Sequence, residues 1–306
     1  MAEDALATLA IGLVGGAIRV GTPYLFVSLG ECITEKSGRV NLGLEGILVA
    51  GAMSGYAAAY LAQSAWAGVA CAALVGLLLG LLHGLVCSLP RVNDIAFGIG
   101  LMLLGTGLAF FLGKPYIQPQ APQLANLPLG AWLADPRWAS ALAINPLFPL
   151  GLALAALVHW GFGATRWGLA LRLVGDHEGT ARALAYPVRT VRVLATAVGG
   201  SFAGVGGAYL SLVYPGSWSE GLSSGQGIMA VALVIFARWR PLGCLAAALL
   251  FGAAGALGPA LQSIGYSAGY HLFNAAPYAL TLAILVASAR PRQTLAGAPG
   301  ELSLTR

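Results

Sequence analysis

The chain has 306 residues, of which 58% are hydrophobic and only 9% are charged, and its net charge at neutral pH is +5. Soluble domains carry roughly 25% charged residues. This composition therefore excludes a soluble enzyme, a disordered chain and a nucleic-acid-binding protein. The class that remains is an all-α, polytopic membrane helix bundle.

The hydrophobic runs predict about nine transmembrane segments, with eight to ten as the range, because roughly 20 apolar residues cross a bilayer as a helix. They lie at about 5–30, 41–62, 67–87, 93–112, 146–163, 193–213, 222–237, 242–258 and 275–289. Arg19, Gly21 and Pro23 interrupt the first segment. Residues 5–18 therefore form either part of one span, a half-span or an interfacial helix.

The basic residues predict the orientation of these segments, because Lys and Arg gather in cytoplasmic loops. Of the 16 Lys and Arg residues, 13 fall in one alternate set of loops and tails, and only Lys114 and Arg137 fall in the other. This sorting predicts an N-terminus outside and a C-terminus in the cytoplasm. We expect residues 1–290 to form one membrane domain with an external loop at 113–145. Residues 291–306 are predicted to be a disordered cytoplasmic tail.

Glycines spaced four residues apart predict close helix packing, since small residues let helix backbones approach in a membrane. Such series include Gly76, Gly80 and Gly84 in the third segment, and Gly200 with Gly204 in the sixth.

Two matching sequences open apolar runs, LEGIL at 44–48 and GQGIM at 225–229. The loop charges place one start on the cytoplasmic side and the other on the external side. That arrangement favours inverted pseudo-repeats, whose interface commonly holds a transport pathway, although chance similarity remains an alternative.

Polar residues near helix starts are the candidates for this substrate pathway, because lipid offers them no partner. The candidates are Asn41, Glu45, Asn93, Asp94, Ser223 and Gln226. Helix capping is the alternative reading of Asn93, Asp94 and Ser223.

Catalytic motifs are missing from the sequence. Residues 107–114 approach a phosphate-binding loop but have the wrong spacing, and Pro115 stands where Ser or Thr is needed. The four cysteines have no C-x-x-C spacing. We therefore expect a non-catalytic protein without metal or cofactor.

The loop 164–192 contains five arginines and is the longest charged segment. Residues 175–186 predict a short helix that Asp176 caps, with Glu178 near its third position and Pro187 after its end. Ala181, Leu184 and Ala185 would form its apolar face. Such a helix either docks on another protein or lies on anionic lipid.

Three stretches carry a resemblance to a known family: GECITEKSGRVNLGLEGIL at 30–48, TRWGLALRLVG at 165–175 and IFARWRPLG at 235–243. They resemble the smaller permease subunit of nucleoside-type ABC importers, within the branched-chain amino acid and simple-sugar permease superfamily. The resemblance implies a type II importer permease in the bacterial cytoplasmic membrane. It also implies that the loop after the fifth span couples to an ATPase subunit.

The coupling residues would then be Asp176, Glu178, Ala181, Arg182 and Ala185. The family usually shows Asn-Pro and paired alanines where this chain has His177-Glu178 and Ala181-Arg182, which leaves the docking detail open.

The resemblance also implies three protein partners: a homologous permease, the ATPase and a substrate-binding lipoprotein. Nucleosides are the expected substrates, with simple sugars or branched-chain amino acids as alternatives. A secondary transporter that acts without an ATPase is a further alternative.

Overall fold

The computed structural model describes residues 2–130, 132, 135–266, 273, 275–288 and 297–304. Within these ranges, seven helices are long and apolar enough to cross a membrane, so the chain is a multi-pass membrane protein. They are α1 (Ala2–Lys36), α2 (Leu44–Ala62), α3 (Ala65–Val86), α4 (Asp94–Gly113), α6 (Leu147–Ala164), α9 (Val188–Leu212) and α11 (Pro241–Ser263).

Two of the nine predicted segments are shorter than a complete span. The run at 222–237 becomes α10 (Gln226–Phe236), which has 11 residues, and the run at 275–289 becomes α13 (Ala276–Ser288), which has 13. Residue 289 lies outside the described residues. Of the nine predicted segments, seven are therefore long enough to span the membrane within the described residues.

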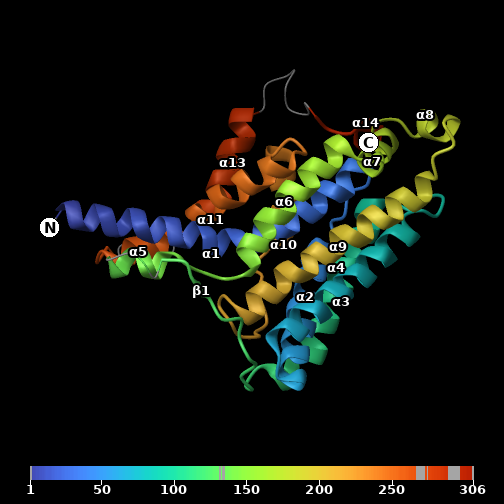
Figure 1. Ribbon diagram of the computed structural model, residues 1–306. Coiled ribbons are helices and arrows are strands. Elements are labelled where there is room, and N and C mark those ends of the chain that lie inside the picture. The colour runs from blue at the N-terminus through green and yellow to red at the C-terminus, as the bar shows by residue number, and fades with distance from the viewer. Residues whose placement is uncertain are drawn as a thin grey trace.

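The first helix, α1, runs without a break for 35 residues and includes Pro23. At 1.5 Å per residue it is about 52 Å long, which exceeds the roughly 30 Å hydrocarbon core of a bilayer. The helix must therefore tilt or extend beyond the core. Figure 1 shows it running from the N-terminus along α11 toward α7. The possibility of a separate half-span at 5–18 is thus excluded.

Short elements lie at the two ends of the bundle. One end, here named the basic end, holds α7 (Arg166–Asp176), α8 (Glu178–Ala183) and α14 (Gly300–Leu304), as Figure 1 shows. The loop after α4 holds a 3-10 turn, η1 (Lys114–Tyr116), then β1 (Leu127–Pro128), α5 (Pro136–Ala141) and β2 (Ala143–Ile144). The two strands pair antiparallel, with Leu127 opposite Ile144, a small exception to the all-α prediction.

The centre of the bundle is formed by α9 and α2. In the most apolar 18-residue stretch of each helix, the buried share is 72% for α9 and 67% for α2. The buried share is only 22% for α4 and 17% for α6. The outer helices therefore leave most of their apolar surface free for lipid.

Glycine contacts bring α3 and α9 together, which is an instance of the close packing that the glycine spacing predicted. A side chain on Gly200 would collide with the carbonyl oxygen of Gly76, and one on Gly76 would collide with that of Gly200. Likewise, a Cβ atom on Gly51 of α2 would lie 2.7 Å from the Cα atom of Gly204. These backbones touch, so the prediction of close packing is confirmed.

We expect Gly200→Val to destabilise the folded chain by at least about 1–3 kcal/mol, because the new side chain would overlap the α3 backbone and neither helix can yield without repacking. The free energy of unfolding in mixed micelles measures this loss. The matched control is Gly107→Val in α4, where a Cβ would meet nothing within 4 Å. Equal stabilities for the two variants would show that the α3–α9 contact is not close.

Candidate functional site

The carboxylate of Glu45, in the first turn of α2, accepts three hydrogen bonds from the segment that begins α10. The donors are the hydroxyl of Ser223, the backbone N–H of Gly225 at 3.1 Å and the backbone N–H of Gly227 at 2.7 Å. The first N–H groups of a helix lack partners within it and carry partial positive charge. A negatively charged side chain of α2 therefore caps the start of α10.

Glycine lets the two helix starts come this close. A Cβ atom on Gly227 would lie 2.5 Å from the Cα atom of Glu45, and one on Gly46 would lie 2.6 Å from the Cα atom of Met102 in α4. The glycine that follows Glu45 or Gln226 in the two matching sequences thus serves the same purpose in each, a backbone contact with a neighbouring helix.

The prediction that the starts of α2 and α10 lie on opposite sides of the membrane is wrong. They do not begin on opposite faces, because Glu45 and Gly227 are in contact. From this contact the helices still run in opposite directions. Tyr56 of α2 donates a hydrogen bond to Pro119 in the loop after α4, whereas Trp239, just after α10, bonds Glu35 near the basic end.

Residues 218–225 lead the chain from the end of α4 to the start of α10 beside Glu45. Trp218 lies against Gly113 at the end of α4, and Gly225 lies against Glu45. With 11 residues, α10 is about 16 Å long, which is about half of the bilayer core. The segment before α10 therefore re-enters the bundle, a feature that loop charges do not reveal.

Of the other predicted pathway residues, Gln226 lies at the Glu45 junction, whereas Asn41, Asn93 and Asp94 make contacts in the turns before α2 and α4. Gln226 begins α10, and its Oε1 atom is buried with no hydrogen-bond partner among the described residues. Asn41 is buried and shapes the turn before α2, since its Oδ1 atom accepts the N–H of Gly43. Asn93 caps α4 by accepting the N–H groups of Ile95 and Ala96.

Asp94 pairs with Arg39 at 2.6 Å. The described contacts therefore gather Glu45, Ser223 and Gln226 at one junction, whereas the contacts of Asn93 and Asp94 lie elsewhere.

Two buried acidic residues that sequence reasoning did not select lie close to this region. Glu31 accepts the N–H of Asn41 at 2.8 Å, and Glu35 accepts the indole N–H of Trp239. Together they fasten α1 to the turn before α2 and to the turn after α10. The available signal was their spacing, because two carboxyl groups one helical turn apart inside an apolar segment must find polar partners.

At the basic end, the predicted helix at 175–186 is two helices. Asp176 is the last residue of α7, and His177 caps α8 by accepting the N–H of Thr180 on its Nδ1 atom at 3.2 Å. Asp176 is therefore not the cap that we predicted. Pro187 directly precedes α9.

The apolar face of α8 is also narrower than predicted. Ala181 is completely buried and packs in a cluster that includes Ile33, Leu171 and Val191, so it cannot contact another chain. Leu184 is 61% exposed, and the exposed Ala185 has a left-handed backbone with φ of 60°. The apolar residues that α8 and its C-terminal turn present are thus Ala183, Leu184 and Ala185.

An ion-pair network joins α8 to α9. Glu178 binds Arg182 at 2.5 Å and Arg192 at 2.6 Å, and Arg192 also donates to the carbonyl oxygen of Ser37 at 3.1 Å. Partial burial raises the pKa of Glu178, but the neighbouring Arg192 and Arg182 guanidiniums outweigh it and hold that pKa below its usual value. Glu178 is therefore the anion that holds α8 to α9.

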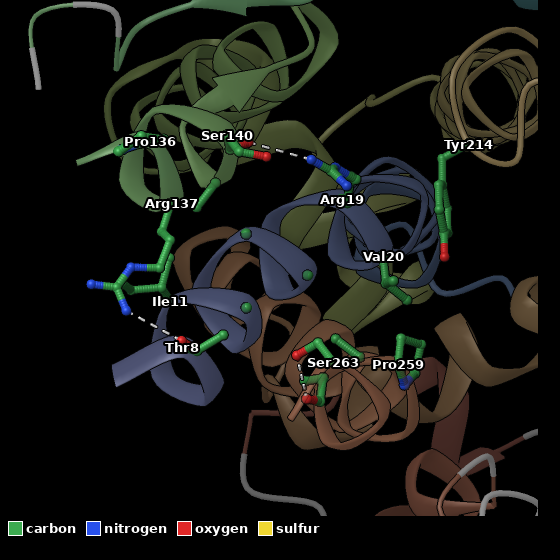
Figure 2. A pocket seen from close by; sticks show the side chains of 16 residues that line it. Thr8, Ile11, Arg19, Val20, Pro136, Arg137, Ser140, Tyr214, Pro259 and Ser263 are labelled. Carbon is green, nitrogen blue, oxygen red and sulfur yellow. Dashed lines mark hydrogen bonds between the residues drawn. The ribbon is translucent and has the colours of Figure 1, made fainter. Parts of the chain in front are cut away.

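A separate cavity of about 510 Å³ lies between α1, α5 and α11. Figure 2 shows Arg19 donating to the carbonyl oxygen of Ser140, and Arg137 donating to the hydroxyl of Thr8, along its wall. None of the predicted pathway residues lines it, so it is distinct from the Glu45 junction.

Comparison with known proteins defines the class of this chain. Residues 13–289 match the family described as "Branched-chain amino acid transport system / permease component", so the chain belongs to that family of transport permeases.

Among individual relatives, the chain is 35% identical to the putative glucose ABC transporter permease TsgC13 of Haloferax volcanii, over 84% of this chain and 80% of that one. It is 30% identical to the nucleoside permease NupC of Lactococcus lactis and 29% identical to the guanosine permease NupQ of Bacillus subtilis, over 89% of this chain and 90% of each relative. Each of these two bacteria has a second similar nucleoside or guanosine permease, at 23% or 24% identity.

Replacing Glu45 by Gln should lower the free energy of unfolding by about 1.5–3 kcal/mol, because the amide weakens charge-assisted hydrogen bonds to the start of α10. Chemical denaturation in mixed micelles provides the measurement. Glu220→Gln is the matched control, since Glu220 is exposed in the same segment. A Glu45→Gln variant as stable as this control would contradict the proposed cap.

Acidification should remove the contribution of Glu178. The pKa of this carboxyl in the folded protein lies below its usual value of 4.5, so its stabilising effect is complete above about pH 4.5 and is lost as the pH falls through the folded-state pKa. We expect wild type to be more stable than Glu178→Gln at pH 7, and the difference to shrink steadily below pH 4.5. Denaturation of both proteins across pH 3–7 measures it. If the stability difference between wild type and Glu178→Gln grew on acidification, Glu178 would not be stabilising as a carboxylate and the prediction would be wrong.

Proposed function

We propose that the chain is the non-catalytic, membrane-spanning permease subunit of an ATP-driven ABC importer that carries nucleosides. The observation that carries this proposal is the similarity to NupC and NupQ over nearly nine-tenths of their lengths. Both are permeases named for nucleoside or guanosine transport.

Simple sugars are the second candidate substrates, because TsgC13 is named for glucose and has the higher identity. Glucose and nucleosides share a hydroxylated ring. The carboxylate of Glu45, the hydroxyl of Ser223 and the amide of Gln226 are groups that bind hydroxyls, so they suit either substrate. Branched-chain amino acids remain the alternative that the family description suggests.

The junction of α2 and α10 is the proposed gate on the substrate pathway. In the present conformation the Glu45 carboxylate is occupied by three donors from the α10 start. Movement of α10 would release these groups toward a passing substrate, and Gln226 already has an unused acceptor. Asn41 would hold the α2 start in place through the turn at Gly43.

The segment formed by α7 and α8 is the proposed contact with the ATPase. Its exposed residues Arg182, Leu184 and Ala185 would meet that subunit, while Glu178 would pass the movement to Arg192 of α9. ATP binding shifts the permease between conformations only if the ATPase binds the two conformations with different affinity.

Orientation and partners complete the proposal. With 13 of 16 basic residues in one set of loops and tails, the N-terminus lies outside and the basic end faces the cytoplasm. The paired permeases of Lactococcus lactis and Bacillus subtilis support a homologous permease partner. The ATPase and a substrate-binding lipoprotein would complete the importer.

The test is uptake by the complex purified through a tag on this chain and reconstituted in liposomes. We expect guanosine uptake that requires enclosed ATP and the binding protein, with glucose and leucine at background. Vesicles without ATP but with an ion gradient are the control.

Uptake of glucose alone would favour the sugar importer. Guanosine uptake driven by the ion gradient without ATP would contradict an ABC importer and favour a secondary transporter.

A further inference from the structure

The helix α14 lies on the proposed coupling segment, at the end of the bundle where Figure 1 labels α7 and α14 together. The tail from residue 291 was predicted to be disordered, but residues 297–304 make defined contacts with the rest of the chain. Residues 291–296, 305 and 306 lie outside the described residues. We name residues 297–304 the strap.

Glu301 of the strap joins α8 to α9. Its Oε1 atom accepts the backbone N–H of Glu178 at 2.8 Å, and its Oε2 atom pairs with the Arg192 guanidinium at 3.5 Å. Since α8 has only six residues, it gains little stability from its own hydrogen bonds. Its position therefore depends on side chains from outside the helix.

The rest of the strap contacts three other places. Lys36, the last residue of α1, donates to the carbonyl oxygen of Gly297 at 3.0 Å. Gly300 lies against the carbonyl oxygen of Asp176, so closely that a side chain there would collide with it. The strap therefore touches the end of α1 and the junction between α7 and α8.

The third contact is with the turn after α10. A Cβ atom on Gly297 would lie 3.1 Å from the carbonyl oxygen of Arg238 in this turn. Ala298 and Leu302 pack against a buried cluster that includes Ala237 and Trp239 together with residues of α1, α10 and α11. This turn ends the short helix whose other end is held by Glu45. One segment thus contacts both the coupling helices and the base of the helix that begins at the gate.

The charges around Arg192 show that Glu301 can be replaced without leaving a buried charge unpaired. The side chain of Arg192 is 8% exposed and faces two carboxylates, Glu178 at 2.6 Å and Glu301 at 3.5 Å. Removal of Glu301 leaves Arg192 paired with Glu178, so no buried charge is stranded. What is lost is the acceptor for the Glu178 N–H, together with the longer of the two Arg192 ion pairs.

We propose that the strap fixes the coupling helices relative to α10, and that Glu301 is a positioning residue for energy coupling. Glu301 acts through α8, whose C-terminal turn presents Leu184, and does not itself contact the ATPase. This inference rests on the proposed function, because it requires α7 and α8 to be the ATPase contact.

The test compares Glu301→Ala and Glu301→Gln in the complete complex in liposomes, with guanosine as the transported probe. The measurement is the number of guanosine molecules imported per ATP hydrolysed. We expect Glu301→Ala to lower this ratio about three- to tenfold, with the ATPase still bound. Glu301→Gln keeps an acceptor for the Glu178 N–H and should fall between Ala and wild type. Glu220→Ala, on an exposed residue of the segment before α10, is the control.

A fourth variant, Leu184→Asp, separates the strap from the proposed function. If it leaves ATPase binding and the transport ratio unchanged, the coupling site itself is wrong. If Leu184→Asp weakens ATPase binding but Glu301→Ala keeps the wild-type ratio, the strap proposal alone is overturned. Loss of ATPase binding in Glu301→Ala would also overturn it, because Glu301 would then be a docking residue.

Discussion

The carboxylate of Glu45 allows α10 to begin inside the bundle, because it binds the first N–H groups of that helix. A helix that begins inside a membrane bundle leaves N–H groups that lipid cannot satisfy, and a partly buried carboxylate such as that of Glu45 needs donors as well. Glu45 meets both requirements with Ser223, Gly225 and Gly227. Because of it, residues 218–225 can leave the end of the bundle and enter its interior.

The short helix α10 is held by carboxylates at both ends. Glu45 of α2 binds its start, and Glu35 of α1 binds Trp239 just beyond its end. Glycine contacts hold the helices around it, as between Gly21 of α1 and Gly252 of α11. A helix that is fixed at two points by side chains of different neighbours responds to a relative movement of those neighbours, which is the property that the proposed gate requires.

Sequence patterns with a local cause predicted much of this fold. Apolar length located seven spans, and four-residue glycine spacing predicted close packing, which the structure shows between α3 and α9. The same patterns failed where distant residues decide. Pro23 does not break α1, because the helix is packed along α9 and α11. His177 caps α8 although Asp176 is the better capping residue type, because α7 continues through Asp176.

The site was predictable in part for the same reason. Glu45, Ser223 and Gln226 stand out as polar residues at the starts of apolar runs, and the structure brings them together. Glu301 and Glu178 meet across 123 positions of sequence, and no local pattern announces such a pairing. Ala181 was selected for an apolar face, but the burial that removes it from the surface comes from Ile33 and Val191 on other helices.

A cryo-electron microscopy map of the assembled complex that resolves side chains would show directly whether Glu45 binds the start of α10. It should place the Glu45 carboxylate within hydrogen-bonding distance of the Gly225 and Gly227 N–H groups, near the 3.1 Å and 2.7 Å found here. A map in which α10 begins at the membrane surface, with Glu45 bound to other groups, would contradict the account.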